Sequence, residues 1–565
     1  MSMQKVTFRP GINAQFTPTL NEGGWELGNL VRFKDGLPQP IGGWQASLRN
    51  VLFGSARGIH SWSALDSTKM LAVGTSSGLY LSTTTQLYEI TPSRATFSPT
   101  NPFAVTLNSN VVTMTVTGHG AVVGDLFLAT PSGGSVTVGG ITITNSFVYQ
   151  VASVIDANTI TFTVSMNATS TSTGGGSVTV LFMISPAAAN GIWSLDNWGE
   201  ELVGCIRNGK IYNWKPSGGY GTRAAVVSSN APAQAACILT AMPERHLVAY
   251  GATNSATGVQ DPMLIAWSDT EDYTTWTASA TNAAGTFRLV GGSQIMAALA
   301  APQEILVWTD TTLWAQRFEG LPYVYGFFQQ GEACGLIGPN AAKVMNGAAY
   351  WMGRQGFFQY AGTVQPLRCT VWDDVFRNLN ENQLSKIYCG TNLGFNEITW
   401  FYPSLNSTEV DSYVTFQTLD GIWTTGLLSR TAWEDTKTFH YPIGIGSDGM
   451  IYYHEIGTSY PGAGNSFIQS GYFDIADGED FVFLDKIIPD FADISGTLTI
   501  TVYGQSFPNG GVKTKGPYTI TSTTPYITVR MRARQILLRI DSTSTNAFWR
   551  LGAIRTLTAP DGRKG

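Results

Sequence analysis

The sequence predicts an all-β protein built on a β-propeller, with an inserted small β-module and a C-terminal β-sandwich-like module. A β-hairpin unit that recurs along the 565 residues is the first observation, and two abrupt changes of composition that interrupt it are the second. The hairpins are separated by roughly 30 to 65 residues, and many separations are near the 40 to 45 typical of propeller blades. We therefore expect blades, whose number the sequence leaves open.

The repeated unit is clearest in two successive hairpins. Residues 304–318 form an apolar strand, a polar turn and a returning strand, and residues 348–360 repeat that order with an aromatic residue just past the turn. Each turn carries Gly or short polar residues that tolerate positive φ, and each return strand opens with apolar residues that can bury one face. The same unit is predicted at residues 71–80, 202–212, 413–423 and 443–452.

Composition divides the chain into four predicted regions. They are an N-terminal arm with the first blade (1–100), an inserted β-barrel or sandwich (101–189), the remaining blades (190–458) and the C-terminal module (459–565). The insert has no Lys or Arg, and its only acids are Asp125 and Asp156. We expect it to project as a separable domain, because an excursion between consecutive hairpins leaves blade pairing intact.

The low proportion of charged residues indicates what kind of surface the protein has. Charged residues make up 13%, against about 25% in an average protein, while aromatic residues make up 12% and the net charge is -6. This composition indicates a folded chain that hides surface in an assembly, or equally an uncharged but solvated surface. The start lacks an apolar signal region and no apolar run reaches bilayer length, so we expect synthesis in a cytoplasm and no membrane insertion.

No catalytic, cofactor-binding or metal-ligating residue is predicted. The five cysteines and five histidines show neither Cys-x-x-Cys nor helical i, i+4 spacing. Three short patterns mimic a nucleophile elbow, a P-loop and a dinucleotide loop, at residues 74–78, 204–210 and 444–449. All three coincide with predicted hairpin turns, whereas those sites require a strand that enters a helix. The protein is therefore expected not to be an enzyme.

One enzymatic alternative stays open, a propeller glycosidase acting on host surface polysaccharide. The segment from Asp269 to Trp276 is similar to the Asp-box turns of sialidases, although Tyr273 stands where the box has Gly. Such an enzyme needs two carboxylates about 5 to 10 Å apart in an open pocket.

The strongest charge feature is a basic C-terminal strand. Residues 530–565 hold eight basic and two acidic residues, a net charge of +6 that leaves -12 on the rest of the chain. Arg530, Arg532 and Arg534 alternate and so share one face of a strand. This strand is a candidate subunit interface or DNA-facing surface, and the subunit contact is favoured because no nucleic-acid-binding fold is visible.

With these parts placed, the order of several motifs resembles that of tail hub or nozzle proteins of short-tailed bacteriophages, the group that includes packaged-DNA-stabilisation (head-completion) proteins. The resemblance covers nearly the whole chain apart from the insert. The motifs are Gly23-Gly-Trp25, Val31-Arg-Phe-Lys-Asp-Gly36, Gly42-Gly-Trp44, Trp267-Ser-Asp269 with Trp276, Ile305-Leu-Val-Trp308, Gln330-Gly331, Gly335-Leu-Ile-Gly338, Trp372-Asp-Asp-Val-Phe376, Arg539-Ile540, Trp549-Arg-Leu-Gly552 and Ala559-Pro-Asp-Gly-Arg563.

The resemblance implies a structural protein of the virion tail that is assembled in the host cytoplasm. Its implied form is a hexameric homo-oligomer, a ring below the portal and adaptor that extends the DNA channel, retains packaged DNA and carries fibres, a spike or a needle. Viral double-stranded DNA would pass through without sequence-specific binding. An acidic or neutral channel lining fits this role, because each phosphate neutralised by Lys or Arg would add affinity that slows the duplex.

Overall fold

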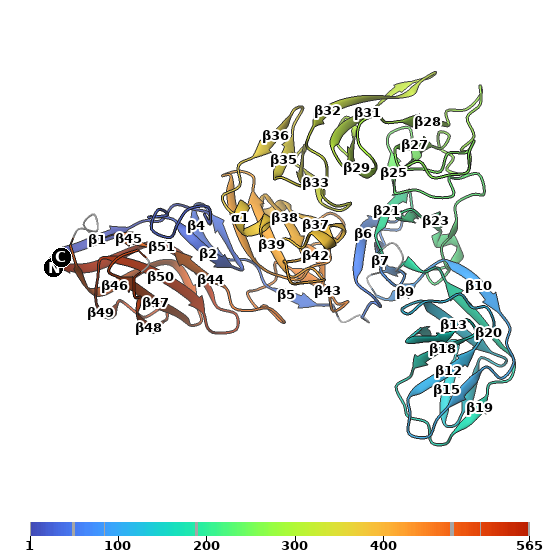
Figure 1. The fold of residues 1–565 in the computed structure, drawn as a ribbon, viewed down its shortest axis with the longest axis horizontal. Coiled ribbons are helices and arrows are strands. Elements are labelled where there is room, and N and C mark those ends of the chain that lie inside the picture. The colour runs from blue at the N-terminus through green and yellow to red at the C-terminus, as the bar shows by residue number, and fades with distance from the viewer. Residues whose placement is uncertain are drawn as a thin grey trace. The chain divides into compact units, whose positions relative to one another are not determined.

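The computed structural model describes residues 2–47, 51–83, 85–186, 190–474, 480–508 and 510–562 (Figure 1). The chain divides into two compact units: residues 1–48, 340–447 and 451–565 form the first, and residues 49–339 and 448–450 form the second. The predicted all-β fold class is confirmed. No helix in the described ranges has the length and hydrophobicity to span a bilayer.

Seven four-stranded antiparallel sheets among the described residues have the form of propeller blades. The second unit contains four of them, whose strands are β6 (Ala56–Ser63), β7 (Lys69–Thr75), β8 (Leu79–Ser82) and β9 (Leu87–Glu89); β21 (Trp193–Trp198), β22 (Glu201–Ile206), β23 (Ile211–Trp214) and β24 (Ala225–Val226); β25 (Cys237–Ala241), β26 (His246–Tyr250), β27 (Leu264–Trp267) and β28 (Gly285–Arg288); and β29 (Ile295–Ala300), β30 (Ile305–Thr309), β31 (Thr312–Gly320) and β32 (Val324–Glu332).

The first unit contains three more blades. Their strands are β33 (Ala342–Met345), β34 (Ala348–Met352), β35 (Phe357–Tyr360) and β36 (Val364–Leu367); β37 (Tyr388–Asn392), β38 (Glu397–Tyr402), β39 (Ser412–Gln417) and β40 (Ile422–Leu427); and β41 (Ala432–Glu434), β42 (Ile443–Ile445), β43 (Ile451–His454) and β5 (Trp44–Ala46). Strand β5 comes from the N-terminal arm, so the last of these blades is completed by a segment about 400 residues distant in sequence. Short helices lie between the strands: α1 (Trp372–Phe376) and the 3₁₀ helices η3 (Glu381–Lys386) and η4 (Leu393–Phe395), with η2 (Pro216–Gly218) in the second unit.

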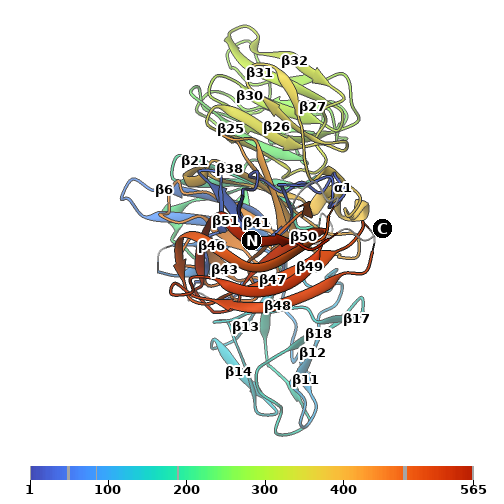
Figure 2. The same cartoon turned by 90° about the vertical axis from the view of Figure 1, so that its left-hand side faces the viewer.

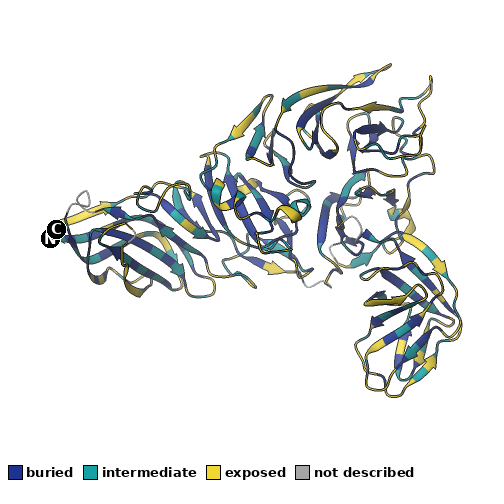
Figure 3. Ribbon diagram, viewed as in Figure 1, coloured by how far each residue is buried: buried dark blue, intermediate teal, exposed yellow. Residues whose placement is uncertain are grey.

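Within each unit, successive blades pack through their first strands. Strands β6, β21, β25 and β29 contact one another in that order, and so do β33, β37 and β41. A tryptophan at the start of a first strand fastens two of these junctions: Trp193 Nε1 donates to Thr75 O at 2.9 Å, and Trp433 Nε1 donates to Thr391 O at 2.7 Å. Each indole packs against a glycine of the preceding blade, Gly74 or Gly390, where a Cβ would clash with the ring. Figure 3 shows the blade strands as mostly buried.

The six predicted hairpins all form antiparallel pairs. The blade from β25 to β28 was not predicted, because none of the six repeated hairpins lies within it. Its first turn, residues 242–245, contains no Gly, and Arg245 adopts a positive φ of 54° there. Its second connection, between β26 and β27, is a long loop. Neither feature matches the hairpin pattern.

The insert is a β-sandwich between β9 and β21. One sheet has the order β10 (Ser93–Phe97), β20 (Val178–Met183), β13 (Leu126–Pro131) and β16 (Val148–Gln150); the other has β17 (Ser153–Asp156), β18 (Thr159–Thr163), β12 (Val111–Thr115), β11 (Phe103–Val105) and β19 (Ser172–Gly174); β14 (Ser135–Val138) pairs with β15 (Ile141–Thr144). Phe127 and Phe162 join the two sheets in an edge-to-face contact of 5.2 Å within an apolar core. The predicted end of the insert at residue 189 lies outside the described residues.

The C-terminal strands form two further sheets together with the N-terminal arm. One sheet has the order β1 (Ser2–Val6), β51 (Phe548–Pro560), β46 (Val482–Ser495) and β49 (Ile527–Ala533); the other has β2 (Trp25–Asn29), β44 (Phe467–Ser470), β50 (Gln535–Ser542), β47 (Leu498–Gln505) and β48 (Lys513–Ile520), with β45 (Phe473–Asp474) also on β50. Figure 2 looks onto the C-terminal strands β46 to β51, drawn in orange and red. Gly504 of β47 faces Met531 of β49 so closely that no Cβ fits, which joins the two layers.

Candidate functional site: a buried arginine held by two glutamates

A buried charged cluster in the first unit centres on Arg32. A tight hairpin of β3 (Val31–Lys34) and β4 (Leu37–Pro40) carries it, and the turn residues Asp35 and Gly36 both have positive φ. Val31 and Phe33 are also buried, so both faces of β3 lie inside the protein. Arg32 is only 4% exposed. Such a buried cation requires carboxylate partners.

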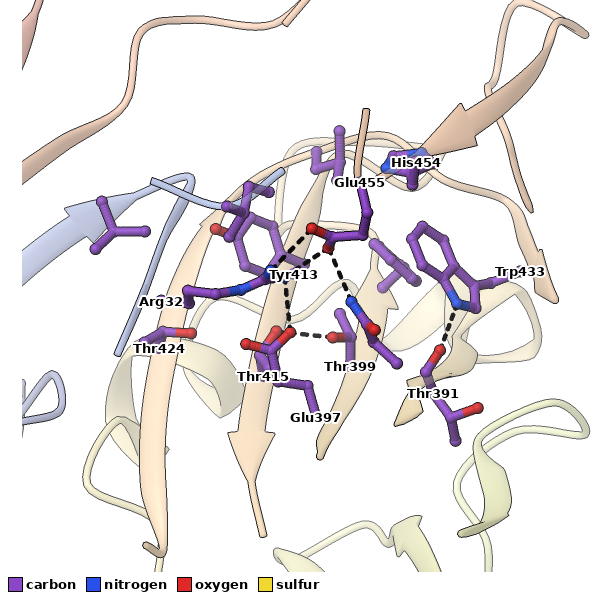
Figure 4. A pocket seen from close by; sticks show the side chains of 15 residues that line it. Arg32, Thr391, Glu397, Thr399, Tyr413, Thr415, Thr424, Trp433, His454 and Glu455 are labelled. Atoms are coloured by element: carbon purple, nitrogen blue, oxygen red, sulfur yellow. Dashed lines mark hydrogen bonds and ion pairs between the residues drawn. The ribbon is translucent and has the colours of Figure 1, made fainter. Parts of the chain in front are cut away.

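Two glutamates supply those partners from different blades (Figure 4). Arg32 Nη2 is 2.9 Å from Glu397 Oε2 at the start of β38 and 2.6 Å from Glu455 Oε1, just after β43. Arg32 Nη1 donates a third bond, of 2.9 Å, to Glu455 Oε2. The guanidinium carbon also lies 3.6 Å from the centre of the Phe395 ring. One side chain of the arm therefore ties together two blades.

Neighbouring groups fix the two carboxylates and the arm. Asn392 donates its side-chain amide to Glu455 Oε1 at 2.8 Å, and Glu455 itself has a positive φ of 61°. The Leu30 amide donates to the Tyr413 hydroxyl at 3.0 Å, directly before β3. The cluster is therefore held by charge-assisted hydrogen bonds on several sides, and its geometry is fixed.

The charges in the cluster are unequal, because one guanidinium faces two carboxylates. Burial raises the pKa of Glu397 to about 7, and Glu455 acts in the same direction against the opposing effect of Arg32. Burial opposes the charge on Arg32, but Glu397 and Glu455 together raise the pKa of the guanidinium above its ordinary value. A proton on Glu397 leaves one positive and one negative charge, and so makes the cluster neutral.

A buried histidine closes one side of the site. Arg430 Nε donates to His454 Nε2 at 2.8 Å, so this ring nitrogen is an acceptor and the imidazole is neutral. Burial lowers the pKa of His454 well below its usual value, with Arg430 and Arg32 acting in the same direction. His454 therefore takes no proton in the neutral pH range.

The space left between these side chains is a cavity of about 40 Å³, which is lined by Arg32, Glu397, Glu455 and residues of the surrounding strands. A cavity needs about 10 to 15 Å³ of such space to hold one water, and pockets for organic ligands begin at about 300 Å³. The cavity therefore has room for a few waters and is too small for a pyranose ring. Its two carboxylates bind the same nitrogen of Arg32, which makes the arrangement a cross-link.

The predicted basic strand lies elsewhere in the first unit: Arg530 and Arg532 are on β49, and Arg534 follows its last residue. Arg530 is exposed, and its positive φ of 51° marks a bulge where the register against β46 shifts. Arg532 is used within the chain: its Nε lies 2.8 Å from Asp561 Oδ2, and its guanidinium lies 3.8 Å from the centre of the Phe481 ring. Arg534 stacks on Phe481 and Phe507. Arg563 and Lys564, counted with this strand in the sequence, lie outside the described residues.

The other sequence patterns lie in hairpin turns or among packed side chains. The loops that mimic an elbow and a P-loop are the β7–β8 and β22–β23 turns, and the third pattern spans the β42–β43 turn. In the Asp-box-like segment, the Tyr273 hydroxyl donates to Glu201 at 2.5 Å and Trp276 Nε1 donates to Tyr273 O. All five cysteines are free thiols, and no group of three metal-ligating side chains occurs in the described part of the chain.

The sequence did not predict the Arg32 cluster, although Val31-Arg-Phe-Lys-Asp-Gly36 is one of the motifs on which the family resemblance rests. Alternation along residues 31–34 places Arg32 opposite Val31 and Phe33, which is the usual pattern of a strand with one face in solvent. Burial of the second face comes from β38 and the segment after β43, more than 360 residues away. An Arg between two apolar residues of a hairpin with an Asp-Gly turn was the only available signal.

Comparisons with known proteins place the chain in no family. No family model matches the sequence, and no curated protein matches it. Among solved structures, an exo-beta-1,3-galactanase from Phanerochaete chrysosporium with beta-1,3-galactotriose is 7% identical with a TM-score of 0.24, over 65% of this chain and 95% of that one. Phage phi92 endosialidase is 12% identical with a TM-score of 0.15, over all of this chain and 71% of that one. At these TM-scores neither similarity bears on function.

Proposed function

We propose that the protein is a non-enzymatic structural component of a bacteriophage tail, a hub or nozzle that assembles as a ring and continues the DNA channel. The Arg32 cluster is the structural observation that carries the scaffold role. Its paired acids, the feature a glycosidase would need, are cross-linked by one guanidinium beside a cavity of about 40 Å³, which is too small for a sugar ring. The motif order that resembles short-tailed phage tail proteins supports the assignment to a tail.

In this proposal the N-terminal arm acts as a strap within the subunit. It adds β1 and β2 to the two C-terminal sheets, places Arg32 between two blades and supplies β5 to one of those two. The pairing of β1 with β51 over five residues joins segments more than 540 residues apart in sequence. Such closure suits a part that must hold packaged DNA under load.

The proposed neighbours are other copies of this chain, an adaptor or head-completion protein, and fibre, spike or needle proteins. Of the three arginines, the exposed Arg530 is the one proposed to contact a neighbouring subunit. Arg532 and Arg534 already contact Asp561, Phe481 and Phe507 within the chain. An exposed ion pair of this kind contributes at most about 1 kcal/mol. It would set the orientation of the subunits more than their affinity.

Electron microscopy of negatively stained tails tests the proposal. We expect a ring of copies at the tail position, and antibody or tag labelling of this chain on that ring. A single copy per tail, or no label on the tail, would overturn it. Isolated protein is not decisive, because a ring of this kind can require its neighbours for assembly.

The glycosidase alternative has its own assay. Host capsule or lipopolysaccharide is incubated with the purified chain, and reducing sugar ends are measured. We expect no release above a heat-denatured control. Release that disappears in Glu397→Gln or Glu455→Gln would show that the cluster is catalytic.

A further inference from the structure

A second pocket, much larger than the ion-pair cavity, lies at one end of the C-terminal strands in the first unit. Two loops form it: residues 458–466, between β43 and β44, and residues 542–547, between β50 and β51. Its volume is about 270 Å³, close to the lower end of about 300 Å³ for pockets that hold small organic ligands. The Arg32 cluster does not contribute to its lining.

Hydroxyl groups dominate the walls of this pocket. The lining includes seven Ser and Thr residues, Asn465 and Tyr460, and none of its described lining residues carries a charge at neutral pH. Phosphate and carboxylate ligands are normally held by Arg, Lys or a helix N-terminus, and the lining offers none of these. The pocket is therefore suited to a neutral ligand that forms many hydrogen bonds.

Hydrogen bonds behind the walls fix the pocket floor. Ser466 Oγ and Ser542 Oγ are 2.6 Å apart, and both residues are buried. The indole Nε1 of Trp549 donates to Ser542 Oγ at 3.0 Å. The backbone repeats the connection between the loops, because the Ser542 amide donates to Ser466 O at 2.9 Å. The floor is thus preorganised, which lowers the entropic cost of binding.

Two lining residues keep hydrogen-bonding capacity beyond their contacts with Thr497. Ser544 Oγ accepts a bond of 2.8 Å from the Thr497 amide, which leaves its own proton to donate. Thr543 Oγ1 donates to Thr497 O at 3.0 Å, which leaves its lone pairs to accept. A hydroxyl of a ligand can satisfy both groups, because it is both a donor and an acceptor.

The opposite loop adds an aromatic surface. Tyr460 lines the pocket, and its hydroxyl donates to Ile41 O at 2.6 Å. The ring also packs against Trp44 with 5.2 Å between centroids. These two contacts hold the ring in one orientation. The face of an aromatic ring carries partial negative charge, which attracts the polarised C–H groups of a sugar ring.

We propose that this pocket binds a neutral saccharide unit. A neutral sugar combines hydroxyls that donate and accept with an apolar C–H face, and it needs no charged partner. This binding role is independent of the proposed tail function, because it rests on the pocket alone.

Saturation-transfer NMR on the full chain tests the proposal, with glucose, galactose, mannose and N-acetylglucosamine as probes at millimolar concentration. We expect transfer to at least one of them. Ser544→Ala should weaken that binding about tenfold, which corresponds to the loss of one well-formed hydrogen bond. Thr545→Tyr fills the exposed rim and should abolish binding. An unchanged unfolding midpoint of this variant would show that the fold is intact.

A matched control separates the pocket from general surface contact. Thr137→Val removes an exposed hydroxyl from the insert, where Thr137 and Thr142 lie 3.1 Å apart, and it should leave binding unchanged. Glucose 6-phosphate and sialic acid should bind more weakly than the neutral sugars. Absence of transfer from all four neutral sugars, equal binding in the rim variant, or preference for the charged sugars would overturn the proposal.

Discussion

In the inserted sandwich an apolar core holds two sheets together, whereas in the first unit a buried ion pair also connects two blades. The insert has an apolar core in which Phe127, Phe162 and Phe182 meet, and Lys and Arg are absent from residues 101–189. The blades instead bury the charge of Arg32 between two segments and hold it with Glu397 and Glu455. Apolar contacts tolerate small shifts in geometry, whereas a buried ion pair fixes one arrangement at the cost of desolvation. The comparison suggests that a module added locally needs only a core, while a strap from a distant part of the chain needs a specific attachment point.

The largest expected effect comes from removing the cation. Arg32→Met keeps much of the side-chain volume but leaves two carboxylates buried without their partner. We expect a loss of about 3 to 5 kcal/mol in the free energy of unfolding of the first unit, measured by urea denaturation with tryptophan fluorescence. Arg377→Met is the matched control, because Arg377 is exposed and pairs with Asp373 within one helical turn, and it should cost no more than about 1 kcal/mol. Equal losses in the two variants would mean that burial gives the Arg32 pair no special role.

An intermediate effect follows from the proton on Glu397. Its pKa in the folded protein, about 7, lies above its ordinary value of 4.5, so the folded state binds more protons between these pH values. The free energy of unfolding should therefore fall as pH rises from about 4.5 to 7, by on the order of 1 to 3 kcal/mol, and level off above pH 7. Glu397→Gln keeps a neutral side chain at this position and should flatten that part of the curve. A wild-type curve that rises over this interval would contradict the assignment.

The smallest effect is expected from deleting the insert. The Ile184 amide donates to Pro92 O at 2.9 Å, so a short Gly-Ser linker can replace residues 93–183. The Gln150 amide bonds to the Ser77 hydroxyl across the boundary, and its loss should cost about 1 kcal/mol. Circular dichroism and the urea midpoint of the remaining chain should show a folded protein. Unfolding of the blades would refute separability.

The deletion also tests what the insert attaches. With so little charge it can hold a partner through apolar contact, backbone hydrogen bonds or strand addition. If the chain is the tail component proposed above, tails assembled with the deleted chain should lack one component, and mass spectrometry against wild-type tails would identify it. A complete set of tail proteins would show that the module attaches none of them.

The sequence by itself determined the elements that depend on neighbours in the chain. Turns rich in Gly, Asn and Asp with apolar flanks predicted the six hairpins, because a hairpin pairs residues only a few positions apart. The absence of Lys and Arg between residues 101 and 189 marked the inserted module for a similar local reason. The turn at residues 242–245 escaped prediction, because Arg245 adopts a conformation that its residue type does not indicate.

The tertiary structure alone decided how distant segments meet. Strand β5 completes a blade with β43, β1 joins β51, and Arg32 reaches Glu397 and Glu455, all across several hundred residues. The hydroxyl-lined pocket likewise needs two loops that are about 80 residues apart in sequence. Residue types set the hydrogen bonds and charges that each segment can offer, but pairing between segments depends on which surfaces folding brings together. Local sequence patterns do not indicate which surfaces will meet, because side chains alternate along a strand in the same way whether an arginine on it is exposed or buried.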